Sequence, residues 1–138
     1  MTPKKPKPKY ASVMLIDDNE IDNFINHKMI EGCNFSEQVY IHTSSKSALE
    51  FLKNIERIES TPKEMIPEII FLDINMPIMD GLQFAEEFDK LSQKFKSRTK
   101  IVILTTSINP SDFETSKKFK NVIKYINKPL THMVLESI

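Results

Sequence analysis

The sequence contains a single cysteine, Cys33, which excludes an internal disulfide framework and any zinc site built from several cysteines. It contains no apolar run near the ~18 residues that a helix needs to cross a bilayer. The charged N-terminus is not followed by an apolar segment, so it does not have the form of a secretory signal. These absences favour a small cytoplasmic domain without membrane insertion.

Net charge is absent as well, because the chain has 19 basic and 19 acidic residues. Four of the basic residues are lysines within residues 1–9, so the other 129 residues carry 15 basic and 19 acidic side chains. A mildly acidic body argues against direct binding of nucleic acid, which needs a basic surface. The alternation of proline and lysine predicts a disordered basic tail over residues 1–10, followed by one domain over residues 11–138.

Five apolar runs are the strand candidates, and no tight hairpin signal joins one run to the next. Runs without polar alternation are typical of strands that are buried on both faces of a parallel sheet. Apolar residues at helical spacing lie between the runs. The pattern predicts an α/β fold, a doubly wound five-stranded parallel sheet with helices on both faces. The runs are residues 11–16, 39–41, 69–72, 101–104 and 122–126.

The helices are expected where apolar residues recur every three or four positions. The first ends at Gly32, and the clearest is expected as one continuous helix over residues 82–95. Ser44 or Ser45 is expected to cap the second helix, and Ser111 is expected to cap the fourth.

Polar residues directly follow four of the apolar runs. They are Asp17 and Asp18, Asp73, Thr105, and Lys128. Each has an ordinary explanation taken alone: a helix cap for Asp18, a loop residue for Asp73, a strand-end hydroxyl for Thr105, and a surface turn for Lys128. The carboxyl ends of parallel strands meet at one edge of the sheet, where open α/β sheets bind ligands. Their shared placement therefore favours one joint site.

Crowded carboxylates repel one another unless a cation lies between them, and Mg²⁺ accepts carboxylate and phosphate oxygens together. An aspartate can also accept a phosphoryl group as an acyl phosphate, with a lysine and a hydroxyl to hold the anion. His27, His42 and His132 fall at positions that favour surface or packing roles, so no general base is evident.

Four segments resemble the receiver domain of two-component response regulators, and the resemblance spans residues 11–137 in the family's order. The segment after the third run is the most specific of the four. The resemblance implies a flavodoxin-like sheet with strand order 2-1-3-4-5, an order known for a receiver protein. The segments are MLIDDNE (residues 14–20), FLDINMPIMDG (71–81), ILTT (103–106) and YINKP (125–129).

The resemblance also implies a role for each matching residue. Asp73 would be the phosphoacceptor, and Mg²⁺ would be held by Asp17, Asp18, Asp73 and the main-chain carbonyl of Asn75. Lys128 and Thr105 would contact the phosphoryl oxygens, and Tyr125 would rotate inward when Thr105 moves. The peptide bond before Pro129 would be cis. The residues expected to modulate the site are Asn75, Thr106 and Ser107.

We therefore expect a stand-alone switch that is not an enzyme. A sensor histidine kinase or phosphotransfer protein would phosphorylate it, and its output would pass through the face formed by the fourth helix, fifth strand and fifth helix. The target would be another protein or a second copy of the chain. Two alternatives remain. A phosphohydrolase with an aspartate nucleophile would need a second aspartate where Asn75 stands, and a flavodoxin-like binding module would meet repulsion from Asp17 and Asp18.

Overall fold

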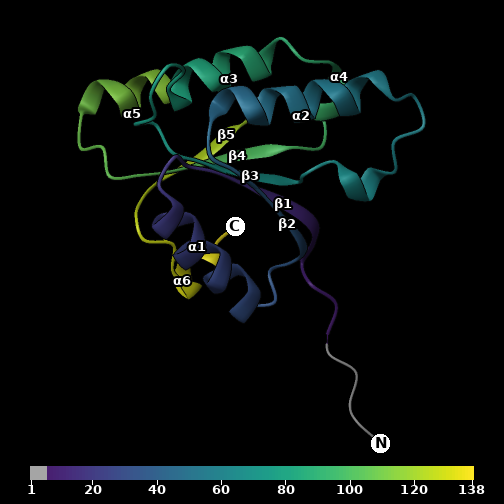
Figure 1. The fold of residues 1–138 in the computed structure, drawn as a ribbon. Helices are drawn as coiled ribbons and strands as arrows, with labels where there is room; N and C mark the ends of the chain where they lie inside the picture. Colours follow the sequence, from purple (N-terminus) through teal and green to yellow (C-terminus); the bar gives the residue numbers. More distant parts are fainter. Residues whose placement is uncertain (1–5) are drawn as a thin grey trace, which may run out of the picture.

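Five parallel strands form one sheet in the order β2-β1-β3-β4-β5, as the computed structural model shows for residues 6–138 (Figure 1). Both edge strands, β2 and β5, pair on one side only. The α/β fold class and the strand order are therefore confirmed. The strands are β1 (Tyr10–Ile16), β2 (Ser36–His42), β3 (Ile69–Leu72), β4 (Lys100–Thr105) and β5 (Val122–Asn127).

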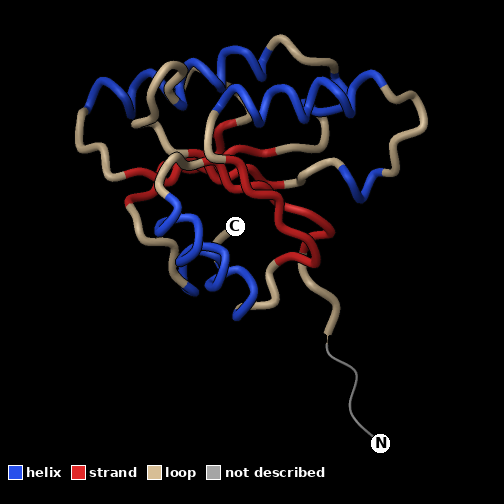
Figure 2. Tube along the Cα trace, in the orientation of Figure 1, coloured by secondary structure: helices blue, strands red, loops and turns tan. Residues whose placement is uncertain are grey.

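Helices cover both faces of the sheet (Figure 2). On one face lie α2 (Ser45–Arg57), α3 (Gly81–Asp89), α4 (Gln93–Lys96) and α5 (Pro110–Ser116). On the other face lie α1 (Glu20–Gly32) and α6 (His132–Glu136). A short 3₁₀ turn, η1 (Lys63–Met65), lies between α2 and β3. Within residues 6–138, no helix has the length and apolar character needed to cross a membrane.

The sheet separates two hydrophobic cores, because successive side chains of a strand point to opposite faces. In β4, Ile101 and Ile103 belong to the core under α2 and α3, whereas Val102 and Leu104 belong to the core under α1 and α6. All four residues of β3 are buried. Burial on both faces is the reason that these strands read as continuous apolar runs.

The sheet includes Tyr10, the last residue of the expected tail, because Tyr10 pairs with Ser36. Pro6 also belongs to the expected tail of residues 1–10, and its carbonyl oxygen accepts a hydrogen bond from Asn34 Nδ2 at 2.8 Å. Lys9 Nζ donates to the main-chain oxygen of Ile138. Residues 1–5 lie outside the described part of the chain.

The prediction of one helix over residues 82–95 is wrong, because α3 ends at Asp89 and α4 is a separate turn. The Leu91 N–H donates to the Phe88 carbonyl three residues back, a tightening that is common where helices end. The spacing still identified the buried face correctly, since Leu91 and Phe95 are both buried.

Both expectations of a serine cap are resolved by hydrogen bonds at the helix starts. Ser44 caps α2, as one of the two alternatives proposed, because its Oγ accepts from the Ser47 N–H at 3.1 Å. Ser111 does not cap α5. The cap is Asn109, whose Oδ1 accepts from the Ser111 N–H at 3.0 Å, and Pro110 takes the first helical position, where it needs no N–H donor.

Gly81 allows the start of α3 to lie against the chain that follows β3. A Cβ atom at this position would be 2.2 Å from the Asp73 carbonyl oxygen and 2.9 Å from Ile74 Cα, both of them backbone atoms. The Gly81 N–H also donates to the Ile74 carbonyl at 2.9 Å. The backbone position of Asp73 at the sheet edge therefore depends on the absence of a side chain at Gly81.

We expect Gly81→Ala to lower the free energy of unfolding by about 1–3 kcal/mol, because the methyl group overlaps backbone that cannot move without shifting Asp73. The matched control is Gly32→Ala, where a Cβ would meet nothing within 4 Å at the end of α1. That variant should be as stable as the wild type or more stable by up to ~1 kcal/mol. Urea denaturation of both variants measures the difference, and equal stabilities would contradict the proposed overlap.

Candidate functional site

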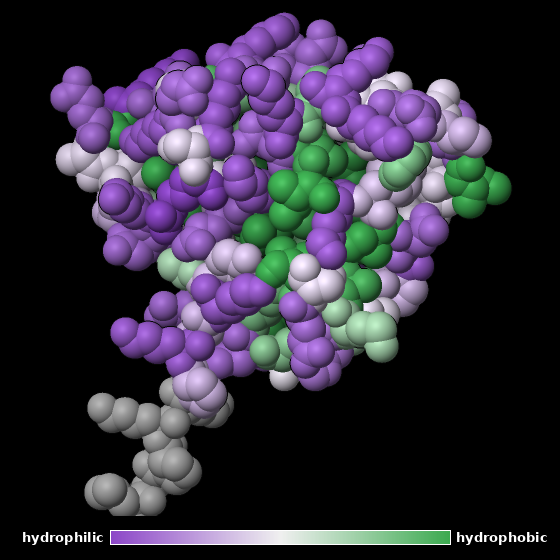
Figure 3. All heavy atoms as spheres, turned by 180° about the vertical axis from the view of Figure 1, so that it is seen from behind, coloured by the Kyte–Doolittle hydropathy of each residue, from purple (hydrophilic) through white to green (hydrophobic). Residues whose placement is uncertain are grey.

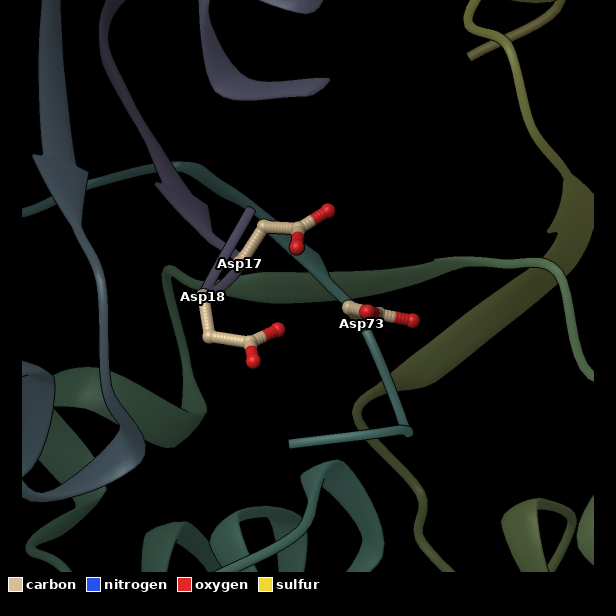
Figure 4. Close-up of side chains that lie close together, drawn as sticks. All are labelled: Asp17, Asp18 and Asp73. Atoms are coloured by element: carbon tan, nitrogen blue, oxygen red, sulfur yellow. The ribbon is translucent and has the colours of Figure 1, made fainter. Parts of the chain in front are cut away.

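Three aspartates lie together at the carboxyl edge of the sheet (Figure 4). Asp17 and Asp18 follow β1, and Asp73 follows β3. Carboxylate oxygens from the three residues lie within 4.8 Å of one another. The sheet fixes two of them through their backbones, since the Asp73 N–H donates to the Ile16 carbonyl at 3.0 Å and the Asp17 N–H to the His42 carbonyl at 3.1 Å.

Lys128 brings a positive charge into this group from the end of β5. Its Nζ lies 2.5 Å from Asp17 Oδ2, 2.9 Å from Asp22 Oδ2 and 3.3 Å from Asp73 Oδ2. Burial by itself lowers the pKa of the Lys128 ammonium, but hydrogen bonds to Asp17 and Asp22 and the charge of Asp73 outweigh burial and raise this pKa. Lys128 therefore remains charged at neutral pH.

The negative charge of the site exceeds its positive charge, because one ammonium faces several carboxylates. Burial raises the pKa of the Asp17 carboxyl, although hydrogen bonds from Lys128 and from the Asn19 N–H act in the opposite direction. Asp73 is 5% exposed, and its Oδ1 has no hydrogen-bond partner among the described residues. A buried carboxylate oxygen without a partner is costly unless a cation or a proton satisfies it.

A small divalent cation fits these residues. Asp17, Asp18 and Asp73 offer hard oxygen ligands close together, and the unpartnered Oδ1 of Asp73 belongs to one of them. Mg²⁺ prefers one or two carboxylates plus water and phosphate oxygens, and Asp18 is exposed on the solvent side of the group. The aspartate cluster is therefore a candidate metal site.

Thr105 ends β4, and Tyr125 lies in the neighbouring strand β5, which Lys128 follows. Thr105 is buried at the end of β4, and its Oγ1 accepts from the Ser107 N–H at 3.2 Å. The Lys128 N–H donates to the Thr105 carbonyl at 3.0 Å, and the Lys128–Pro129 peptide bond is cis. The Tyr125 ring packs edge-on against Phe113, with centroids 5.3 Å apart.

Two of the residues expected to modulate the site, Asn75 and Thr106, are exposed in the loops that follow β3 and β4. The third, Ser107, is partly buried and its Oγ donates to Asp112 Oδ2 at 2.6 Å. The side chains of the three histidines make other contacts. His27 and His132 pair with glutamates one helical turn away, and His42 contacts Ser47 Oγ at 2.8 Å.

Asp22 is the site residue that the sequence interpretation missed. It lies in the first turn of α1, and its contact with Lys128 joins residues 106 positions apart. An acidic residue in a first helical turn is ordinarily explained by the helix dipole, so no local signal pointed to the lysine. The spacing of four residues between Asp18 and Asp22 was the one usable sign. It places Asp22 over the end of β1, but only once the start of α1 is known.

The start of α1 also removes the helix-cap explanation of Asp18. The N-cap is Asn19, whose Oδ1 accepts from the N–H groups of Ile21 and Asp22 at 3.0 Å each. Asp18 is exposed and belongs to the carboxylate group instead. Its position is therefore explained by the site and not by the helix.

The response regulator receiver domain family model matches residues 13–138. Among curated proteins, the sensor histidine kinase CheAY of Helicobacter pylori is 29% identical over 137 residues, which is 99% of this chain and 15% of that protein. The response regulator Rcp1 of Synechocystis is 28% identical over 100 residues, covering 72% of this chain and 65% of Rcp1. The chain thus spans less than two thirds of either relative.

Solved structures give the same fold. A two component response regulator from Cytophaga hutchinsonii has 31% identity and a TM-score of 0.80, with 91% of each chain covered. The chemotaxis response regulator CheY4 of Vibrio cholerae has 20% identity and a TM-score of 0.71, with 93% of this chain and 94% of that chain covered. At 20% identity the second match supports the architecture alone.

We expect Asp18→Ala to leave the metal-free protein as stable as the wild type or slightly more stable, because it removes one of several crowded carboxylates. The neighbouring change Asn19→Ala should lower the free energy of unfolding by ~1 kcal/mol, since it removes the cap of α1. Thermal denaturation in EDTA compares the two. A loss in Asp18→Ala as large as that in Asn19→Ala would restore a structural role for Asp18.

Proposed function

Since the chain belongs to the response regulator receiver domain family, we propose that Asp73 is the residue that accepts the phosphoryl group of this phosphorylation-controlled switch. The observation that carries the proposal is the Asp73 carboxylate itself. One of its oxygens is buried and has no hydrogen-bond partner within residues 6–138, and the other lies 3.3 Å from the Lys128 ammonium. This carboxylate is thus placed against a positive charge and has a free oxygen for the incoming phosphorus.

In the proposed step, an Asp73 oxygen attacks the phosphorus of a phosphohistidine, the bond from phosphorus to the histidine nitrogen breaks, and an acyl phosphate forms on Asp73. The phosphohistidine would belong to a sensor histidine kinase or phosphotransfer protein. The ligands of Mg²⁺ would be Asp17, Asp18, Asp73 and the main-chain carbonyl of Asn75. The bound metal would supply positive charge that neutralises the transferred group.

Lys128 and Thr105 would hold the phosphoryl oxygens. Lys128 supplies a charged donor that is already at the site, and the Thr105 hydroxyl, which accepts from the Ser107 N–H, could turn to donate its own hydrogen to a phosphoryl oxygen. We infer that three neighbouring residues adjust access to the acyl phosphate. They are Asn75, which lies two positions after Asp73, and Thr106 and Ser107, which follow Thr105. Since Asn75 stands where an aspartate-nucleophile phosphohydrolase needs its second aspartate, we favour a switch over an enzyme. We also propose that the switch is cytoplasmic.

We further propose that the output surface is formed by α5, β5 and α6. β5 is an edge strand, so it has no strand on its outer side. Exposed apolar side chains occur in or beside all three elements, at Ile108, Phe113, Ile123 and Met133. Figure 3 shows the molecule from behind Figure 1, with apolar side chains gathered near the centre of this face among hydrophilic ones. Patches of this kind are typical of protein contacts, and the partner would be a target protein or a second copy of the chain.

We expect Asp73→Asn to abolish phosphorylation while the fold is retained, because asparagine has nearly the same shape but is not a competent acceptor. Incubation with Mg²⁺ and a small acyl phosphate, followed by intact-mass measurement, should detect one added phosphoryl group on the wild type and none in EDTA. The control Asp89→Asn changes an exposed aspartate at the end of α3 and should label normally. Full labelling of Asp73→Asn would refute the assignment.

We expect Tyr125→Ala to reduce the spread of activation to the output surface without preventing phosphorylation. The phosphoryl group adds about two negative charges beside Thr105, and the Tyr125 ring occupies the space next to the loop that Thr105 begins. NMR with beryllofluoride, a phosphoryl mimic, should show smaller amide shifts over residues 105–138 in this variant. Tyr40→Ala, in the opposite edge strand, is the matched control and should retain them. Wild-type shifts in Tyr125→Ala would exclude the proposed role.

A further inference from the structure

Three carboxylates surround the Lys128 ammonium, but only two of them belong to the aspartate cluster of Asp17, Asp18 and Asp73. The third, Asp22, reaches the ammonium from α1 on one side of the sheet. Its side chain is 33% exposed, whereas those of Asp17 and Asp73 are 6% exposed. Among the described residues, Asp22 is thus the most exposed carboxylate that contacts this lysine.

We propose that Asp22 is a positioning residue that holds the Lys128 ammonium toward α1 in the unphosphorylated protein and releases it to the phosphoryl group. The inference rests on the proposed function, since it assigns a step to the same site. Asp22 would not touch the phosphoryl group itself. It would set how much of the lysine's charge and hydrogen bonding is available to that group.

The hydrogen bonding of the ammonium requires such an exchange. A lysine has three N–H donors, and three carboxylates already accept from Lys128. Its Nζ also lies nearer to Asp17 and Asp22 than to Asp73, at 2.5 and 2.9 Å against 3.3 Å. A phosphoryl oxygen on Asp73 can therefore gain a bond from the lysine only when one of these three carboxylates gives up its own.

Asp22 is the partner that can be released at the smallest cost. In the metal-free protein, moving the lysine away from the buried Asp17 carboxylate would leave that charge without a counter-charge, which is strongly unfavourable. The Asp22 carboxylate can be hydrated, because a third of it is already exposed. It also lies in the first turn of α1, where the helix dipole stabilises a negative charge after the lysine has left.

The backbone of α1 would not need to move in this exchange. The Asn19 cap accepts from the Asp22 N–H at 3.0 Å, and Asn23 Nδ2 donates to the Asp17 carbonyl oxygen at 2.8 Å. These bonds fix the first turn of the helix to the end of β1. Release therefore requires only a rotation of the Asp22 side chain.

We expect Asp22→Asn to accelerate phosphorylation by a small acyl phosphate about threefold to tenfold, with a similar gain in affinity for beryllofluoride, because the lysine is no longer held by a competing carboxylate. Glu20→Gln is the matched control. It removes the same charge from the same turn of α1, but Glu20 is exposed and is not one of the three carboxylates that contact Lys128. It should react at the wild-type rate.

Three further measurements separate release of Lys128 from a general effect of charge or folding. The gain from Asp22→Asn should vanish when it is combined with Lys128→Gln, and Asp22→Glu should restore a rate near that of the wild type. In the wild-type protein, beryllofluoride should shift the carboxyl carbon resonance of Asp22 more than that of Glu20. This last measurement needs no variant, so it holds even where a substituted protein folds poorly.

The outcomes distinguish this inference from the proposed function. A wild-type protein that takes no phosphoryl group on Asp73 would refute the proposed function. If the wild type is labelled but Asp22→Asn reacts at the same rate, only the role of Asp22 is refuted. Equal acceleration by Glu20→Gln, or a gain that persists without Lys128, would also refute it, because the effect would then not pass through the lysine.

Discussion

The site depends on one buried ammonium that is shared among carboxylates from different parts of the chain. Lys128 follows β5, yet it contacts the residues after β1 and β3 and the first turn of α1. Without this charge, the carboxylates of Asp17, Asp22 and Asp73 would repel one another at a sheet edge that excludes water from two of them. With it, the cluster is held together but remains net negative, which is the condition under which a divalent cation is attracted.

The rest of the fold supplies the rigidity that this arrangement needs. Two cores bury the central strands on both faces, so the strand ends cannot shift to relieve the repulsion of the carboxylates. The close approach of Gly81 to the Asp73 backbone closes the site from the α3 side. On the other side, Asn23 of α1 binds the Asp17 carbonyl. The energetic cost of crowding charges at the sheet edge is therefore offset by apolar packing a few residues away.

The sequence was sufficient to predict the α/β class and the position of Asp17, Asp18, Asp73 and Lys128 at one edge, because the strand runs were unbroken and each ended at a polar residue. It was insufficient where a side chain's direction depends on the geometry of a helix start. Asp22 faces the lysine only because Asn19 begins α1 where it does. The break between α3 and α4 was missed for a related reason, since the buried face continues through Leu91 and Phe95 while the hydrogen bonding does not.

A chain of contacts links the proposed phosphoryl site to the proposed output surface. Thr105 Oγ1 accepts from the Ser107 N–H, and Ser107 Oγ donates to Asp112 Oδ2 in the first turn of α5. The Tyr125 hydroxyl lies 3.5 Å from the Ser107 carbonyl oxygen. A Thr105 hydroxyl that turns toward a phosphoryl oxygen would leave the Ser107 N–H without its partner, and the Ser107 loop would have to adjust. Because the same serine holds α5 and borders Tyr125, the adjustment would reach the helix and the edge strand together.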